Sequence, residues 1–153
     1  MIRVQAEPFD AGHEIAAFGA GRTDMGGIAS FIGLVRAEHA GDTVAAMTLE
    51  HYPGMTERKL AEAEAEARRR WPLLDVLVIH RYGRMLPGEP IVLVLTGSAH
   101  RAAALDACAF LIDWLKTGAP FWKLEETEAG ERWVEARASD DLAAARWDSG
   151  GPP

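Results

Sequence analysis

The chain has 153 residues, of which 48% are hydrophobic and 25% charged, a size and composition typical of one globular domain and unlike those of a mainly disordered chain. Its 16 Lys and Arg against 23 Asp and Glu give a net charge of −7, which disfavours nucleic acid as a partner because phosphate is repelled. We expect a cytoplasmic protein with no internal disulfide, because the sequence has no signal-peptide pattern, no membrane-spanning apolar stretch and a single cysteine, Cys108.

The first part of the chain alternates between strand and helix patterns. Residues 2–6 alternate as a short strand, and residues 10–20 have the pattern of a helix that begins with an Asp cap. Two further runs, 26–36 and 44–52, are rich in small, apolar and β-branched residues, which is typical of strands. A polar loop, 37–43, separates them, and this connection predicts that the two strands form a hairpin.

A helix and two strands are predicted next. Residues 56–70 consist mostly of Ala, Glu, Arg and Leu, which favour a helix that must end before Pro72. Two apolar runs follow, 74–82 and 90–96, separated by a loop that contains glycine and proline. They predict two paired strands.

The last part contains a helix, a hairpin and a second helix. Apolar residues three and four apart predict an amphipathic helix over 102–116. Residues 121–126 and 132–136 flank a turn and predict a hairpin, and residues 139–147 have a helical pattern. The elements together predict an α+β fold with a largely antiparallel sheet and hairpins packed by helices. We expect a single domain over residues 1–147 and a frayed tail at 148–153.

Residues 98–101, Ser-Ala-His-Arg, lie where a predicted strand passes into a helix. The first turn of a helix exposes N–H groups and a partial positive charge, which suit an anion, and His100 and Arg101 add donors there. The alternative is structural: Ser98 caps the helix and Arg101 is solvated. From these residues alone, the structural alternative is the commoner one.

Two lysines follow at the end of the same helix. Lys116 continues its apolar face, so it either projects into a pocket or places a cation at the helix C-terminus. Lys123 shares one side of the next strand with Phe121 and Glu125, and a short turn joins it to the helix. The two side chains could converge, and crowding of two ammonium groups would leave one partly neutral near pH 7, as general-base or nucleophilic chemistry requires.

Arg36 and Cys108 are weaker candidates. Arg36, at the end of a strand, could hold a phosphate through its guanidinium fork, although a surface ion pair is the commoner explanation. Cys108 lies on an apolar stripe between Leu105 and Ile112, which indicates a buried structural thiol. The five histidines have no metal-binding spacing, and no phosphate-binding loop is present, so we expect neither a metal nor a cofactor.

Several motifs occur in order along the chain: Phe31-x-Gly33-x-Val35-Arg36, Leu49-Glu50-His51-Tyr52-Pro53-Gly54-Met55, His80-Arg81-x-Gly83, Ser98-Ala99-His100-Arg101, Asp113-x-Leu115-Lys116, Ala119-Pro120-Phe121-Trp122-Lys123-x-Glu125 and Gly130-x-Arg132-Trp133-Val134-Glu135. In this order they resemble one family, the large, catalytic subunits of molybdopterin synthase (MoaE). The resemblance covers roughly residues 1–147.

This resemblance implies an α/β hammerhead fold, a homodimer, and a heterotetramer in which each large subunit receives a small ubiquitin-like sulfur carrier. The carrier ends in Gly-Gly as a thiocarboxylate. Its sulfur is transferred twice to cyclic pyranopterin monophosphate, which gives the dithiolene of molybdopterin. Because the sulfur arrives on the partner, the catalytic subunit needs no cysteine of its own.

Residue by residue, the resemblance places the family's essential lysines on Lys116 and Lys123. The other substrate-binding positions expected from it are Arg36, His100 and Arg101 for the anion and Leu34, Val35, Leu124 and Glu125 for the lining of the pocket. Many relatives carry basic residues at the positions of Leu34 and Leu124. The absence of two positive charges there bears on substrate affinity rather than on the type of reaction.

The sequence leaves three functions open. In a sulfurtransferase, Lys116 would act as the acid/base or transient nucleophile, and Lys123 would position the substrate and share its charge. A binding module without turnover is the second possibility, favoured by Leu34 and Leu124 but disfavoured by the two lysines. The third, a metal-independent phosphatase acting on the cyclic phosphate, lacks a water-activating carboxylate in the motifs.

Overall fold

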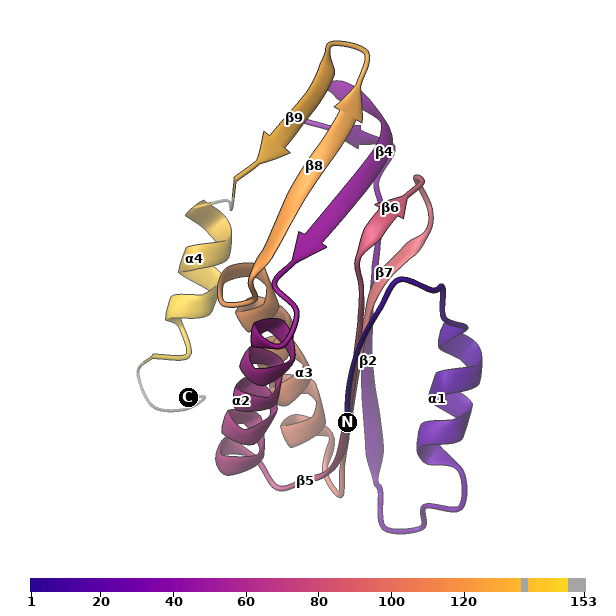
Figure 1. Ribbon diagram of the computed structural model, residues 1–153. Helices are drawn as coiled ribbons and strands as arrows, with labels where there is room; N and C mark the ends of the chain where they lie inside the picture. The colour runs from indigo at the N-terminus through magenta and orange to yellow at the C-terminus, as the bar shows by residue number, and fades with distance from the viewer. Residues whose placement is uncertain (136–137, 149–153) are drawn as a thin grey trace.

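Two β-sheets and four helices make up the described part of the computed structural model, residues 1–135 and 138–148 (Figure 1). The predicted α+β class is confirmed. The first sheet has the strand order β1-β5-β7-β2, which are β1 (Ile2–Gln5), β5 (Leu73–Arg81), β7 (Pro90–Ser98) and β2 (Gly27–Leu34). Its strands are antiparallel except β1, which runs parallel to β5.

The second sheet is antiparallel and rises beyond one end of the first (Figure 1). Its order is β3-β4-β8-β9, which are β3 (Glu38–His39), β4 (Asp42–His51), β8 (Phe121–Thr127) and β9 (Gly130–Val134). A short strand, β6 (Gly83–Met85), also pairs with β4. The predicted pairings of β5 with β7 and of β8 with β9 are confirmed, and so is the largely antiparallel character.

Helices cover both faces of the first sheet (Figure 1). One face packs against α1 (Ala11–Gly19), and the other against α2 (Met55–Arg70) and α3 (Arg101–Thr117). A last helix, α4 (Ala138–Ala145), packs against α3. The predicted helix at 139–147 is thus present over a slightly earlier range, and residues 149–153 of the predicted frayed tail lie outside the described residues.

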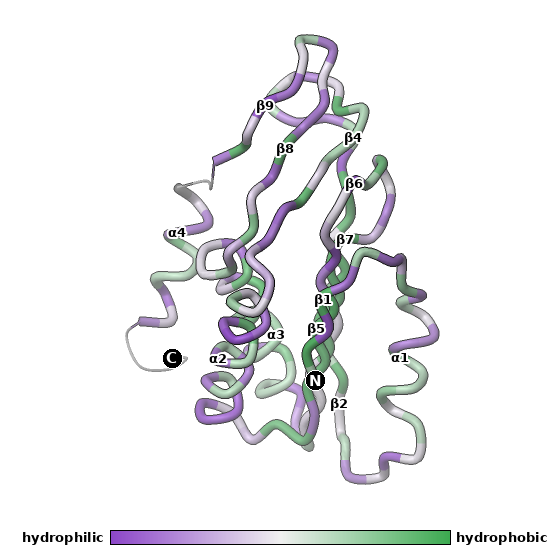
Figure 2. Tube along the Cα trace, in the orientation of Figure 1, coloured by the Kyte–Doolittle hydropathy of each residue, from purple (hydrophilic) through white to green (hydrophobic). Residues whose placement is uncertain are grey.

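Strand alternation explains why the first sheet is buried on both faces. In β5, Val76 and Val78 point toward α2 and α3, whereas Leu77 and Ile79 point toward α1. A strand covered on both sides needs apolar residues at consecutive positions, and β5 and β7 have them. The strands of this sheet accordingly form the most hydrophobic part of the chain trace in Figure 2.

The predicted hairpin between residues 26–36 and 44–52 is wrong. Strand β2 pairs instead with β7, and β4 pairs with β8. The chain reverses at Ala40 and Gly41, whose φ angles of 52° and 83° are those of a two-residue hairpin turn. This turn closes β3 onto β4, so the predicted loop contains a strand of its own and β2 is left to complete the first sheet.

Candidate active site

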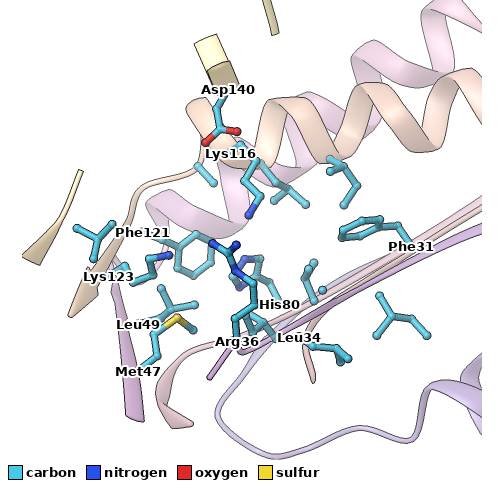
Figure 3. A pocket seen from close by; sticks show the side chains of 18 of the residues that line it. Phe31, Leu34, Arg36, Met47, Leu49, His80, Lys116, Phe121, Lys123 and Asp140 are labelled. Atoms are coloured by element: carbon cyan, nitrogen blue, oxygen red, sulfur yellow. The ribbon is translucent and has the colours of Figure 1, made fainter. Parts of the chain in front are cut away.

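A cavity of about 550 Å³ opens between the two sheets, beside the C-terminal end of α3 (Figure 3). Its volume lies in the range of small-molecule sites. Apolar side chains from both sheets form much of its wall, including Phe31, Met47, Leu49, Ile91, Val92 and Phe121. Three cationic side chains also line it, from a loop, a helix and a strand: Arg36, Lys116 and Lys123.

The structure brings Lys116 and Lys123 to the same cavity. Lys116 lies in the last turn of α3, and the N–H of Gly118 donates to the Trp114 carbonyl (2.7 Å) where the helix ends. A side chain at Gly118 would approach the Trp114 ring within 2.8 Å, so this tight turn favours glycine. The chain then enters β8, where Lys123 pairs in register with Leu49. In Figure 3 both ammonium groups point into the cavity.

Arg36 reaches the cavity from the segment that follows β2. The preceding residue, Val35, is buried, and both of its backbone polar groups are hydrogen-bonded. Its N–H donates to the Glu89 carbonyl (3.0 Å), and its carbonyl accepts from the N–H of Gly88 (2.7 Å). The backbone is therefore anchored immediately before Arg36. Its guanidinium lies near the two lysines in Figure 3, where three positive groups favour an anion.

A smaller cavity of about 90 Å³ shares Arg36, Lys116 and Lys123 with the first. Buried Glu125 lines it and contacts the Nδ1 atom of His39, and the Nε atom of Arg132 lies 3.6 Å from the same carboxylate. Glu125 is among the site residues predicted from the sequence, whereas His39 is not. No motif identifies His39, because its approach to Glu125 depends on the pairing of both β3 and β8 with β4.

His80 is a second lining residue that the sequence analysis did not select. It is buried at the end of β5, its Nδ1 lies 2.9 Å from the Arg81 carbonyl oxygen, and its ring stacks on Phe121 with centroids 3.9 Å apart. Burial lowers the pKa of His80 from 6.5 to about 4, and the positive charge of Lys116 acts in the same direction. The imidazole is therefore neutral near pH 7.

Two predicted site residues lie far from this cavity. His100 and Arg101 are exposed at the N-terminal end of α3. Lys116 lies 15 positions after Arg101 in the helix, which corresponds to roughly 22 Å along the axis at about 1.5 Å of rise per residue. Neither residue lines the cavity of its own chain.

Of the remaining predicted site residues, three line at least one cavity and one lines neither. Leu34 lines both cavities, and Val35 and Glu125 line the smaller one. Leu124 lines neither, because it alternates with Lys123 and Glu125 and faces the other side of β8.

Ser98 and Cys108, for which the sequence favoured a structural role, are both buried and stabilise the fold. Ser98 is fully buried, and its hydroxyl donates to the Pro72 carbonyl (2.9 Å), which ties the end of β7 to the start of β5. Cys108 is buried, as predicted, and burial raises the pKa of its thiol to about 11. A thiol in this environment is a poor nucleophile near neutral pH.

Among residues 1–135 and 138–148, no three His, Cys, Asp or Glu side chains lie together in a way that could hold a metal ion. In the same part of the chain, no helix is both long enough and apolar enough to cross a membrane.

Comparisons with known proteins identify the family. A family model described as MoaE protein matches residues 4–118. A molybdopterin synthase catalytic subunit from Pseudomonas aeruginosa is 54% identical over 147 residues, which cover 96% of this chain and 98% of that protein. A solved molybdopterin biosynthesis MoaE protein from Burkholderia ambifaria has a TM-score of 0.82 and 52% identity over 97% of both chains. Molybdopterin synthase from Staphylococcus aureus has a TM-score of 0.80 and 28% identity over 87% of this chain and 96% of that one. The chain therefore belongs to the MoaE family of molybdopterin synthase catalytic subunits.

Proposed function

We propose that this chain transfers sulfur from the C-terminal thiocarboxylate of a small ubiquitin-like carrier to cyclic pyranopterin monophosphate. The convergence of Arg36, Lys116 and Lys123 on one cavity carries the proposal. Three cations suit the negative phosphate of this substrate, and the apolar wall between them suits a flat heterocycle. The cytoplasm, expected from the single cysteine, is the compartment we assign to the reaction.

The two lysines have separate roles in this proposal. Lys116 acts as the acid/base or transient nucleophile, because it projects from a helix end directly into the cavity. Lys123 positions the substrate and shares its negative charge. Cys108 takes no part, because its thiol is buried in the core beneath α3 and the sulfur arrives on the carrier.

A homodimer accounts for the position of His100 and Arg101. Since they lie roughly 22 Å along α3 from Lys116, they cannot serve the cavity of their own chain. We assign them to substrate binding in the cavity of a second copy. A two-fold dimer would give each cavity one such pair, because a symmetric interface repeats every contact.

Reconstitution with three components tests the function. The purified chain, the thiocarboxylated carrier and cyclic pyranopterin monophosphate should together yield molybdopterin, measured chromatographically over time. A carrier that ends in an ordinary carboxylate is the negative control. Failure of the folded chain to form product with an active carrier would refute the proposal.

Carrier truncation tests the mode of binding. A carrier that lacks its terminal Gly-Gly should bind markedly more weakly, because its tail no longer reaches the cavity. Equal affinities for the full and truncated carriers, measured by calorimetry, would exclude tail insertion.

Mixed dimers test the assignment of Arg101. Lys116→Ala and Arg101→Ala dimers should each be impaired, but a re-equilibrated equal mixture should recover activity. With random exchange, half of the dimers are mixed and each contains one intact site, so roughly a quarter of all sites are restored. No recovery after demonstrated subunit exchange would place Arg101 outside the partner's site.

A further inference from the structure

His80 lies at the boundary between the apolar core of the first sheet and the cavity. Val76, Val78 and His80 alternate along β5 and point to the same face. The two valines are buried against the helices, whereas His80 lines the cavity together with Lys116. This residue is the polar end of an otherwise apolar stripe.

Two contacts hold the His80 ring in one orientation. Its Nδ1 lies 2.9 Å from the Arg81 carbonyl oxygen, and its face stacks on Phe121 at an interplanar angle of 18°. A carbonyl oxygen can only accept, so Nδ1 carries the proton in this contact. Because the pKa of His80 is about 4, the ring has no second proton near pH 7 and Nε2 is an acceptor.

This acceptor differs from the other polar groups around it. Arg36, Lys116 and Lys123 can only donate when charged. The carboxylates that line the cavity, Glu135 and Asp140, belong to the segment after β9 and to α4. A neutral imidazole accepts a hydrogen bond and leaves the positive potential of the cations intact. A carboxylate in the same place would reduce that potential through its negative charge.

We propose that Nε2 of His80 accepts a hydrogen bond from an N–H group of the substrate's heterocycle and so orients that ring in the cavity. The inference rests on the proposed function, since it requires the pterin to bind here. It makes His80 a substrate-binding residue whose task is to orient the ring, while the cations bind the phosphate.

The depth of His80 favours the heterocycle over the carrier tail as its ligand. Only 8% of His80 is exposed, and Phe121 covers one face of its ring, so a ligand reaches it along the wall of the cavity. The sulfur at the very end of the tail must meet the heterocycle. The heterocycle therefore lies deeper than the tail and is the group that meets the ring edge.

Three substitutions separate the acceptor from the packing. Glutamine can place an amide oxygen near the position of Nε2, asparagine can keep only the contact to the Arg81 carbonyl, and phenylalanine keeps only the stacking. We expect His80→Asn and His80→Phe to weaken binding of cyclic pyranopterin monophosphate by about two- to tenfold, the range of one net hydrogen bond. His80→Gln should bind nearly as tightly as the unsubstituted chain.

Binding is measured by calorimetry without turnover. The pterin and the carrier with an ordinary carboxylate end are titrated separately into each variant. Carrier affinity should be unchanged throughout. His51→Gln is the matched control, because His51 also packs near Phe121 (6.0 Å between centroids) but does not line either cavity. Thermal unfolding confirms that each variant is folded.

Each other outcome overturns the proposal. If all three His80 variants bind the pterin normally, the ring is only structural. If His80→Gln is as weak as His80→Phe, packing rather than an acceptor matters. If the loss falls on the carrier, the tail is the ligand of His80. If the unsubstituted chain binds no pterin, the proposed function itself fails, which the same titration reveals.

Discussion

The two halves of α3 face different surroundings although they belong to one amphipathic helix. The N-terminal part of the helix, up to Leu111, packs against the first sheet through small and apolar side chains that include Ala103, Ala104, Ala107, Cys108 and Leu111. The second half extends beside the opening between the sheets, where Ile112, Leu115 and Lys116 line the cavity.

This contrast limits what helix periodicity can predict. Spacing identifies the inward face of a helix, but it does not tell whether a core or a cavity lies opposite. On the sheet side, β5 has the same transition, from Val78 in the core to His80 at the cavity. Core and site are thus continuous, and substitutions on either side of the boundary should have different consequences.

The largest expected effect is that of Lys116→Ala on the cavity side. Loss of general acid–base catalysis should lower the rate of molybdopterin formation by ~10² to 10⁴ without unfolding the chain. Lys116→Arg keeps the charge but stays protonated, so it should remain nearly inactive. Lys59→Ala, which removes an exposed lysine on α2 paired with Glu62, is the matched control. Full turnover with arginine would show that charge alone suffices.

At the boundary, His80 should make stability depend on pH. Its pKa in the folded chain, about 4, lies below the usual 6.5, so the folded state binds fewer protons. The stabilising contribution is complete above pH 6.5 and is lost as the pH falls toward 4, with a total on the order of 3 kcal/mol. Urea titrations should show a steeper loss of unfolding free energy over this window than in His80→Phe. Parallel curves for the two proteins would contradict the buried neutral state.

Lys123→Ala should cost less than Lys116→Ala. Removal of one charged hydrogen-bond donor lowers activity by about tenfold to a hundredfold, because the other two cations still bind the phosphate. Initial rates of molybdopterin formation, measured for both variants, provide the comparison. A loss equal to that of Lys116→Ala would indicate that the two lysines act as one unit.

Cys108→Ser should affect stability and leave the chemistry intact. A hydroxyl buried where α3 packs against the first sheet lowers the free energy of unfolding by roughly 1 to 3 kcal/mol unless it finds a hydrogen-bond partner. Denaturant unfolding measures this loss, and turnover at saturating substrate should be normal. Folded mutant protein that binds carrier and substrate but has lost all turnover would give the thiol a chemical role after all.

The smallest expected effect is a difference in pterin affinity between lysine substitutions at Leu34 and at Leu124. Leu34→Lys adds a cation to the lining of the cavity and should tighten pterin binding by up to about fivefold, since a solvent-exposed charge contributes at most ~1 kcal/mol. Leu124→Lys should leave affinity unchanged, because its side chain faces away. Calorimetry that found equal gains in both variants would mean that net charge, rather than position, sets affinity.

The sequence by itself determined the local elements and part of the site. Asp10 caps α1 by accepting from the N–H of His13 (3.0 Å), and Gly118 ends α3, as their residue types predict. The convergence of Lys116 and Lys123 was also predictable, because a short turn leaves them little freedom to separate. Such features depend on neighbours in the chain, and residue type specifies them directly.

Only the tertiary structure decided which distant segments meet. The partner of β2 is β7 rather than β4, and no local signal distinguishes these choices, because every strand offers the same backbone donors and acceptors. The entry of His80 into the cavity and the distance of Arg101 from it follow from the same pairing. Strand pairing and burial depend on the whole chain, and they decide which side chains share a site.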